Sequence, residues 1–345
     1  MKTLLNRAAR EGTPLVDGDQ VTFIWKGSKA PLLIGDFTDW HTSPIELRAA
    51  GKGVWKYQMK VPTNSYLEYI FVDGETRYED PFNTHRINNG VSKVNNYLRM
   101  PEAQTSHWAQ LSKGGLQGQV SEHEVRADML AEESQRKVWL YQPPSSEPAP
   151  LLVVYDGRDY LRRARLAVQV DRMITAGIIP PVALAMVDNA GKRRFVEYAC
   201  SEATLGFLMM EVIPLAVKEM NLVDYTQHPG AYAIMGASLG GLMALYAGLR
   251  LPGVFGRVLS QSGCFSVGDY EFVVWDLIRH SDIKPKRFWM EVGRYEGLLQ
   301  CNRDLLNLLR EKDWHMAYRE YNGGHNYTSW CDSLSQGLTW LFGKD

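Results

Sequence analysis

The segment that decides the fold is residues 231–241, AYAIMGASLGG. An apolar run, Ala231–Met235, leads into Gly236-Ala237-Ser238-Leu239-Gly240, and a helix-forming run follows. A serine on a sharp turn between a strand and a helix has a strained backbone, and side chains two positions before or after it would collide with the turn. The two glycines remove those side chains. The pattern therefore predicts that Ser238 is a nucleophile at the end of a buried strand.

Apolar strands and helices alternate along the chain on both sides of this segment. Continuous apolar strands between helices are typical of a parallel sheet that is covered on both faces. We therefore expect an α/β domain with a mostly parallel sheet, of the α/β-hydrolase type, over residues 106–345. The expected strands are Leu151–Tyr155, Val182–Val187, Ala231–Met235, Arg257–Ser260, Phe288–Val292 and Met316–Tyr321, after an antiparallel pair, Glu124–Leu130 and Lys137–Gln142. The expected helices are residues 159–175, 203–220, 239–250, 299–312 and 328–342.

A serine hydroxyl is a weak nucleophile unless a base removes its proton, and in this fold the base follows the nucleophile in the chain. The histidines after Ser238 are His280, His315 and His325. His325 comes directly after the last expected strand, and two glycines before it let the loop bend. We therefore expect His325 to be the base.

The base needs an acid that fixes its tautomer and stabilises the imidazolium ion. Glu296 lies in a glycine-flanked turn, Gly293–Gly297, directly after the expected strand Phe288–Val292. We expect Glu296 to be this acid. Glu291, within the strand, and Asp304, on the following helix, are the alternatives.

Two backbone N–H groups are needed to stabilise the oxyanion of a tetrahedral intermediate. The residue after the nucleophile, Leu239, normally supplies one of them. The second is expected from the turn that follows the strand Leu151–Val154, where we select the amide of Arg158, with Gly157 as the substitute.

The first part of the chain has a different pattern. Turn residues interrupt short apolar runs about every ten residues, which is the spacing of an antiparallel β-sandwich. We therefore expect an all-β domain over residues 1–105. Its expected strands are Val21–Trp25, Pro31–Ile34, Val54–Lys60, Leu67–Val72 and Lys93–Leu98.

The composition excludes several classes of protein. Lys and Arg total 38 against 39 Asp and Glu, so a net charge of −1 supplies no global field for nucleic acid or an anionic membrane. The opening residues lack a signal-peptide core, and no run approaches the roughly 18 apolar residues of a membrane span. The four cysteines are widely spaced, which favours free thiols and a cytoplasmic location. We find no metal-ligand spacing and expect no cofactor.

Several motifs together carry a resemblance to a known family. They are Pro143-Pro144, Asp156-Gly157, Arg194–Tyr198, Gly236–Gly241 and Gly323-Gly324-His325. In their order and spacing, residues 120–345 resemble the putative esterase family, which contains enterochelin esterases, feruloyl esterases and mycolyltransferase-like proteins. The resemblance implies an esterase with a serine nucleophile.

The N-terminal domain has a resemblance of its own. Gly35–Trp40, Tyr69–Gly74, Asp80-Pro81 and Asn95-Asn96 look like the early-set, immunoglobulin-like β-sandwich that is related to glycogen-binding modules. This chain has Thr76 and Arg77 where those modules usually carry a tryptophan. The resemblance also implies a role in framing the site, because a similar domain precedes the esterase domain in cytoplasmic enterochelin esterases.

Local charge suggests a substrate. Arginines at 158, 162, 163 and 165 and the run Lys192-Arg193-Arg194 follow two strands that end at the same sheet edge. If Arg158, Arg193 and Arg194 face the pocket, they would bind an anionic substrate such as a ferric catecholate siderophore. A carbohydrate esterase that removes acetyl or feruloyl groups is the second hypothesis, and a noncatalytic binding protein on a hydrolase scaffold is the third. The alternative for Arg194 is an ion pair with Glu197.

Overall fold

The structure is a computed structural model, and it describes residues 2–40, 42–88, 93–110, 114–131 and 134–343. The chain divides into two compact units. The first comprises Met1–Thr105, Gly293–Gly297 and Glu320–Ser329, and the second comprises Ser106–Val292, Leu298–Arg319 and Trp330–Asp345. Two short segments from the C-terminal part of the chain thus belong to the unit that is built mainly from the N-terminal part. The two domains expected from the sequence, residues 1–105 and 106–345, stay a prediction.

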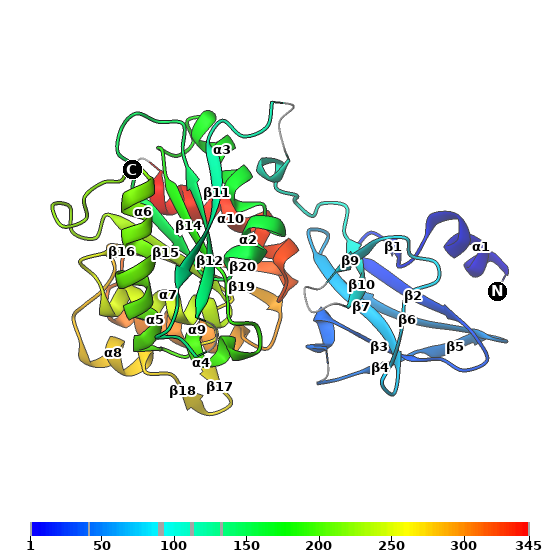
Figure 1. Cartoon of the computed structure of the whole chain (residues 1–345). Helices are drawn as coiled ribbons and strands as arrows, with labels where there is room; N and C mark the ends of the chain where they lie inside the picture. Colours follow the sequence, from blue (N-terminus) through cyan, green and yellow to red (C-terminus); the bar gives the residue numbers. More distant parts are fainter. Residues whose placement is uncertain (1, 41, 89–92, 111–113, 132–133, 344–345) are drawn as a thin grey trace. The chain divides into compact units, whose positions relative to one another are not determined.

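The first unit contains two antiparallel sheets with a shared apolar core (Figure 1). One sheet has the order β1-β2-β6-β5, and it consists of β1 (Leu15–Asp17), β2 (Gln20–Lys26), β6 (Val54–Lys60) and β5 (Arg48–Gly51). The other is built around β7 (Tyr66–Asp73), with β3 (Leu32–Gly35), β4 (Ile45–Glu46), β8 (Thr76–Tyr78), β9 (Arg86–Asn88) and β10 (Val94–Arg99). Phe23, Tyr69 and Phe71 pack between the sheets. The helix α1 (Lys2–Glu11) was not expected from the sequence.

The second unit contains a mostly parallel sheet. Its strand order is β11-β12-β14-β13-β15-β16-β19-β20. The strands are β11 (Gln119–Arg126), β12 (Gln135–Gln142), β13 (Leu151–Val154), β14 (Ala183–Val187), β15 (Tyr232–Ala237), β16 (Phe255–Gln261), β19 (Arg287–Tyr295) and β20 (Met316–Gly324). Pairing is antiparallel from β11 to β14 and parallel from β14 through β13, β15 and β16 to β19.

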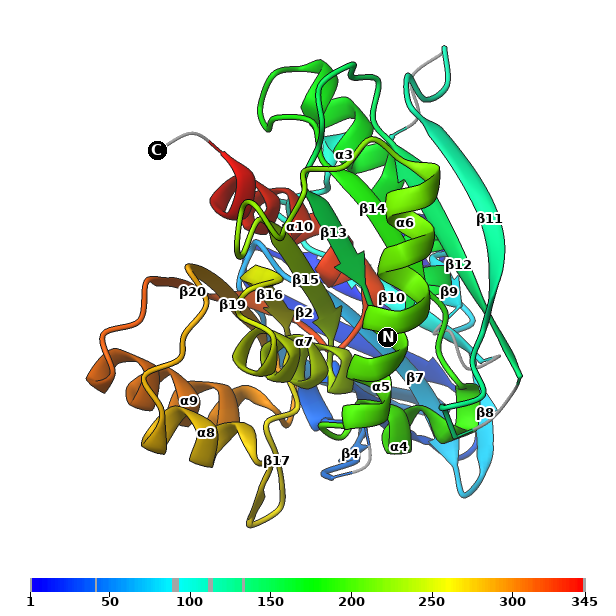
Figure 2. The ribbon, with the colours of Figure 1, turned by 60° about the vertical axis from the view of Figure 1, so that its left-hand side comes forward.

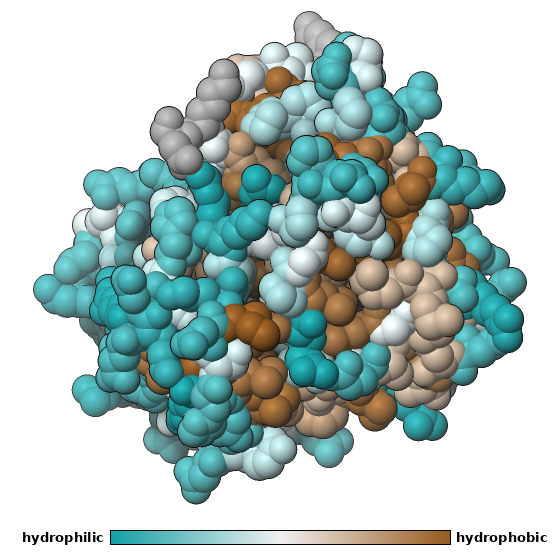
Figure 3. Space-filling model, turned by 90° about the vertical axis from the view of Figure 1, so that its left-hand side faces the viewer, coloured by the Kyte–Doolittle hydropathy of each residue, from teal (hydrophilic) through white to brown (hydrophobic). Residues whose placement is uncertain are grey.

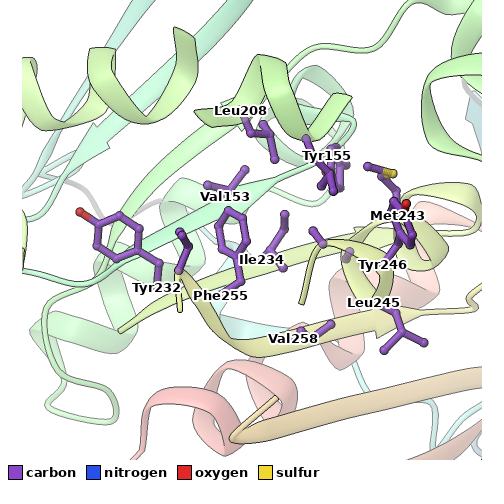
Figure 4. Close-up of a cluster of buried hydrophobic side chains, with 14 of the residues drawn as sticks. Val153, Tyr155, Leu208, Tyr232, Ile234, Met243, Leu245, Tyr246, Phe255 and Val258 are labelled. Atoms are coloured by element: carbon purple, nitrogen blue, oxygen red, sulfur yellow. The ribbon is translucent and has the colours of Figure 1, made fainter. Parts of the chain in front are cut away.

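Helices cover both faces of this sheet, with α6 and α7 on one face and α3 and α10 on the other (Figures 1 and 2). The helices are α2 (Gly157–Arg162), α3 (Leu166–Thr175), α4 (Arg194–Tyr198), α5 (Glu202–Phe207), α6 (Ile213–Glu219), α7 (Leu239–Arg250), α8 (Val274–His280), α9 (Leu299–Glu311) and α10 (Tyr327–Phe342). Figure 4 shows part of this core, in which Val153, Ile234 and Val258 from adjacent strands lie in one buried cluster with Leu208 and Tyr246. The predicted α/β-hydrolase fold is confirmed.

Three sequence-based boundaries were wrong for identifiable reasons. The expected helix 159–175 is split, because Arg165 has a φ of 51° and cannot continue a right-handed helix. The expected helix 203–220 contains a π-helical turn, Leu208–Val212, directly before Pro214, which cannot donate to the preceding turn. The strand expected at Glu124–Leu130 begins and ends earlier in the chain, as β11. Its pairing with β12 runs from Gln119 to Arg126.

Among the described residues, no single helix has the length and apolar composition of a membrane span. One bent pair, Gly191–Tyr198 with Glu202–Glu219, passes that test together, by length and composition only, and its bend is 99°.

Candidate active site

The nucleophile candidate Ser238 lies on the turn between β15 and α7, in the second unit. Its backbone has φ 59° and ψ −124°, a region that residues with a side chain rarely adopt. A Cβ atom at Gly236 would overlap the backbone of Gly240, which explains the glycine two residues before the serine. The turn is thus compact enough to place the Ser238 side chain at the carboxyl edge of the sheet.

Both backbone groups of Ser238 are held by the neighbouring strand and loop. Its N–H donates to the carbonyl of Gln261 at 2.9 Å, and its carbonyl accepts from the amides of Gly241 at 3.0 Å and Cys264 at 3.1 Å. Leu239 is the first residue of α7, so its N–H has no acceptor within the helix. The role of this amide as an oxyanion donor stays a prediction.

A second strained turn lies at the same edge of the sheet. β13 pairs in parallel with β15, with Val154 opposite Met235, so the residues after both strands emerge side by side. Asp156 has a φ of 55°, and α2 begins at Gly157. The amide of Arg158 is therefore in the first turn of α2, where N–H groups lack acceptors within the helix. Its role as the second oxyanion donor stays a prediction.

An ion pair connects these two turns. The guanidinium group of Arg194 donates to both carboxylate oxygens of Asp156, at 2.7 and 2.6 Å. Its Nη2 also donates to the carbonyl of Ala237, the residue before the nucleophile, at 3.0 Å. Asp156 is 2% exposed and also accepts from Asn189 at 2.8 Å. Sequence reasoning noticed Asp156 only as part of a turn and missed this link.

Two other arginines near this edge are paired with carboxylates. The alternative interpretation of Arg194, an ion pair with Glu197, is wrong, because Glu197 is buried against Arg136, with contacts of 2.8 and 2.9 Å. Arg158 lies 2.5 Å from Asp188, and burial raises the pKa of that carboxyl group while Arg158 opposes the increase. Arg193 is exposed. The positive charge at this edge is therefore smaller than the sequence suggests, because aspartates lie among the arginines.

His325 and Glu296 are both in the first unit, within its two C-terminal segments. The Nδ1 atom of His325 lies 2.5 Å from Oε2 of Glu296. The other oxygen of Glu296 accepts from the amide of Gly293 at 2.5 Å. The Glu296 side chain is 1% exposed, whereas that of His325 is 33% exposed. A buried carboxylate thus holds one imidazole nitrogen and leaves the ring partly open.

The two alternative acids have other surroundings. Glu291 is fully buried in β19, where it accepts from Gln261 at 2.6 Å and from Ser333 at 2.5 Å, and burial raises its pKa. Asp304 is on the exposed side of α9 and accepts from Gln300 at 2.8 Å. Of the three candidates, Glu296 is the one hydrogen-bonded to His325 in the structure.

Aromatic side chains lie near the segments that flank the nucleophile turn. Phe195, directly after Arg194, is 54% exposed, and its ring centroid is 6.4 Å from that of Phe272. Tyr270, on the β17–β18 hairpin (Ser266–Val267 and Tyr270–Glu271), is 66% exposed and 5.7 Å from Phe272. Figure 3 shows apolar areas among hydrophilic ones on the face that it presents.

No group of three or more His, Cys, Asp or Glu side chains within the described ranges could hold a metal ion. The four cysteines are free, and three of them are only partly buried. Burial raises the pKa of the Cys264 thiol to about 11, so this neighbour of the nucleophile turn is a poor thiolate.

Comparisons with known proteins show which proteins the chain is similar to. The iron(III) enterobactin esterase of Dickeya dadantii is 27% identical over 98% of this chain and 92% of its own length, and that of Escherichia coli K12 is 25% identical over 92% and 90%. The crystal structure of the enterobactin esterase of Shigella flexneri in the presence of enterobactin has a TM-score of 0.77, at 23% identity over 93% of this chain and 92% of that one. A ferulic acid esterase structure covers 66% of this chain and 98% of its own, with a TM-score of 0.54 and 18% identity.

A family model described as "Putative esterase" matches residues 131–341, which is more than half of the chain. The protein therefore belongs to this esterase family and is a carboxylic ester hydrolase.

Proposed function

We propose that the protein is a serine esterase that hydrolyses the ester bonds of a ferric catecholate siderophore and so frees its iron. Ser238 is the nucleophile, His325 is the base and Glu296 is the acid. Ser238 occupies a strained turn between a strand and a helix, and His325 is hydrogen-bonded through Nδ1 to a buried Glu296. The three residues follow the chain order nucleophile, acid and base that this fold uses.

The chemistry begins when Oγ of Ser238 attacks the carbonyl carbon of the ester. The proton of the Ser238 hydroxyl group passes to Nε2 of His325. Glu296 accepts the Nδ1–H hydrogen bond and stabilises the imidazolium ion. The amides of Leu239 and Arg158 donate to the oxyanion. His325 then protonates the leaving alcohol, and water, activated by the same base, hydrolyses the acyl-enzyme to the carboxylic acid and free Ser238.

The observation that carries the substrate proposal is the extent of the likeness. The iron(III) enterobactin esterases match both the N-terminal region and the hydrolase region, because they cover 98% and 92% of the chain. The carbohydrate-esterase alternative has less support, since an acetyl esterase matches only 26% of the chain and the ferulic acid esterase structure only 66%. A cytoplasmic location and the roles of Arg158, Arg193 and Arg194 in substrate binding stay predictions.

Two features beside the nucleophile turn suit such a substrate. A ferric tris-catecholate is anionic, and the exposed side chains of Lys192 and Arg193 follow β14, the strand next to β13. The exposed rings of Phe195 and Tyr270 can pack against catechol rings. Iron would arrive and leave with the substrate, as cargo.

Hydrolysis assays test the proposal directly. The purified protein and its Ser238→Ala variant are incubated with a ferric catecholate trilactone, an acetylated sugar and a feruloylated sugar. We expect the kcat/KM for the trilactone to exceed that for either sugar ester by about 10²-fold or more, because the sugar esters lack the ferric catecholate group that the protein would bind. Faster hydrolysis of a sugar ester would replace this function with the carbohydrate-esterase alternative.

A further inference from the structure

The residues on either side of His325 both contact one aspartate of the first unit. Asp36 begins a short 3₁₀ turn after β3, and its carboxyl group packs so closely on Gly324 that a Cβ atom there would overlap it. The side-chain amide of Asn326 donates to Oδ2 of Asp36 at 3.3 Å. The backbone before and after the candidate base is thus fixed on a single carboxyl group.

The same short turn also contacts the segment that carries Glu296. The carboxylate of Asp39 accepts a hydrogen bond from the amide of Gly297 at 3.2 Å, directly after the candidate acid. Thr38 closes the turn between these two aspartates, since its hydroxyl bonds the N–H and the carbonyl of Gly35 at 3.0 and 2.9 Å. One rigid turn therefore supports both partners of the hydrogen bond between His325 and Glu296.

We propose that Asp36 and Asp39 are positioning residues for catalysis, which hold the His325 and Glu296 loops at the geometry that their hydrogen bond requires. The inference rests on the proposed function of His325 and Glu296. It gives the Gly35–Trp40 motif a role in the chemistry of the protein, in place of the glycan binding that related modules would suggest.

The surroundings of Asp36 fit this role. Its carboxyl group is 2% exposed, and it also accepts from the amide of Glu68 at 2.7 Å and from Nε1 of Trp40 at 3.1 Å. Burial raises its pKa well above the usual range, and the nearby charges of Glu68 and Glu296 raise it further. These donors, together with Asn326, hold the carboxyl group of Asp36 in one position against the segment that carries His325.

A purely structural aspartate in the same unit provides a matched control. Asp80 is 1% exposed, and it accepts from the hydroxyl groups of Thr13 at 2.7 Å and Tyr69 at 2.8 Å. Burial raises its pKa as well. Its hydrogen-bond partners in the structure lie in the N-terminal part of the unit, away from the loops at 293–297 and 320–329.

The experiment compares Asp36→Ala, Asp39→Ala and Asp80→Ala in the full chain, below the melting temperature of each. Three quantities are measured: kcat and KM with a p-nitrophenyl ester, the rate of Ser238 labelling by a fluorophosphonate, and the downfield NMR resonance of the His325 Nδ1 proton. We expect Asp36→Ala to lower kcat by about 10- to 100-fold with little change in KM, because small misplacements of a catalytic group have effects of this size. Its Nδ1 resonance should broaden or vanish.

Asp39→Ala, which changes an exposed residue, should lower kcat by a few fold, and Asp80→Ala should keep both kcat and the resonance. Equal losses in Asp36→Ala and Asp80→Ala, or an unchanged Asp36→Ala, would overturn the inference. If Asp36→Ala does not fold, the Asp39→Ala variant tests the inference instead. An unchanged kcat and an unchanged Nδ1 resonance in Asp39→Ala would then overturn the inference. Failure of the proposed function is separate, because it would appear as a fully active His325→Ala variant or as no cleavage of the siderophore.

Discussion

The segment of the candidate nucleophile and the segment of the candidate base and acid are supported in different ways. The nucleophile turn at Ser238 and the turn at Asp156 both follow strands of the second unit, and the ion pair of Asp156 with Arg194 connects them. The base and acid are in the first unit, where Asp36 accepts from neutral N–H donors. The ion pair joins loops of the second unit, whereas the support of the base comes from Asp36, in the N-terminal part of the first unit. The difference suggests that the N-terminal sandwich cannot be removed without loosening the base.

The largest expected effect comes from removing the reactive group of either segment. Ser238→Ala and His325→Ala should each lower kcat by roughly 10⁶-fold, because the members of a triad act as a unit. Each variant should keep the circular dichroism spectrum and melting temperature of the wild type, since both side chains are partly exposed. Ester hydrolysis measured with a chromogenic substrate tests the loss.

Labelling provides the check on this first comparison. A fluorophosphonate should modify the wild type at Ser238, should not modify Ser238→Ala, and should react very slowly with His325→Ala. A folded and fully active alanine variant at either position would remove that residue from the proposed triad.

The second effect distinguishes the two buried glutamates. Glu296→Gln should lower kcat by roughly 10²- to 10⁴-fold, because a neutral amide orients the imidazole poorly and cannot stabilise its charge. Glu291→Gln should leave kcat near the wild-type value, since its partners are Gln261, Ser333 and Trp289. Kinetics of both variants at one pH decide between them. A large loss in Glu291→Gln alone would move the acid to β19.

Much of the second unit could be predicted from the sequence, because the central strands β13, β14, β15 and β16 are buried almost throughout and appear as apolar runs. The candidate residues Ser238, Glu296 and His325 could be found for a related reason. Each follows an expected strand, so the rules for the carboxyl edge of a parallel sheet select them as candidates.

The residues that support the site could not be predicted in this way. The partner of Arg194 is 38 residues away at Asp156, although Glu197 lies one turn along the same helix. Asp36 and Asn326 are 290 residues apart in the chain. Periodicity and motif spacing describe local structure, so they contain no information on contacts of this range.

The third prediction tests the ion pair of the nucleophile segment. Arg194→Gln leaves the Asp156 carboxylate buried without its cation, which typically costs about 3–5 kcal/mol in unfolding free energy. Because Arg194 also bonds Ala237, kcat should fall as well, by about 10-fold or more. Arg158→Gln is the matched control, since the Arg158 side chain is 51% exposed and its pair with Asp188 should contribute below about 1 kcal/mol. Equal melting temperatures for the two variants would contradict the difference.

The fourth prediction concerns pH and the base segment. The folded-state pKa of Asp36 is raised, so the folded protein keeps a proton there that the unfolded chain loses above about pH 4. The contribution of this proton to stability is complete below that pH and is lost as the pH rises through the folded-state pKa. The wild type should therefore lose stability relative to Asp36→Asn as the pH rises above about 4. Urea unfolding followed by tryptophan fluorescence measures the difference, and the opposite slope would indicate an ionised Asp36.

The smallest expected effect concerns the exposed cations beside the nucleophile segment. Replacing both Lys192 and Arg193 with Gln should raise the KM for a ferric catecholate by a few fold and leave the KM for a neutral ester unchanged, because only the anionic substrate loses an attractive charge. The effect should fade with added salt, since exposed charges are screened over about 10 Å at 0.1 M ionic strength. Replacing Lys284 and Lys286 removes the same charge before β19, at the amino edge of the sheet, and should change neither KM. An equal rise in the KM for the ferric catecholate in both double variants would mean that only the net charge of the protein matters. Equal salt dependence of the KM for the anionic and neutral substrates would favour the carbohydrate-esterase alternative.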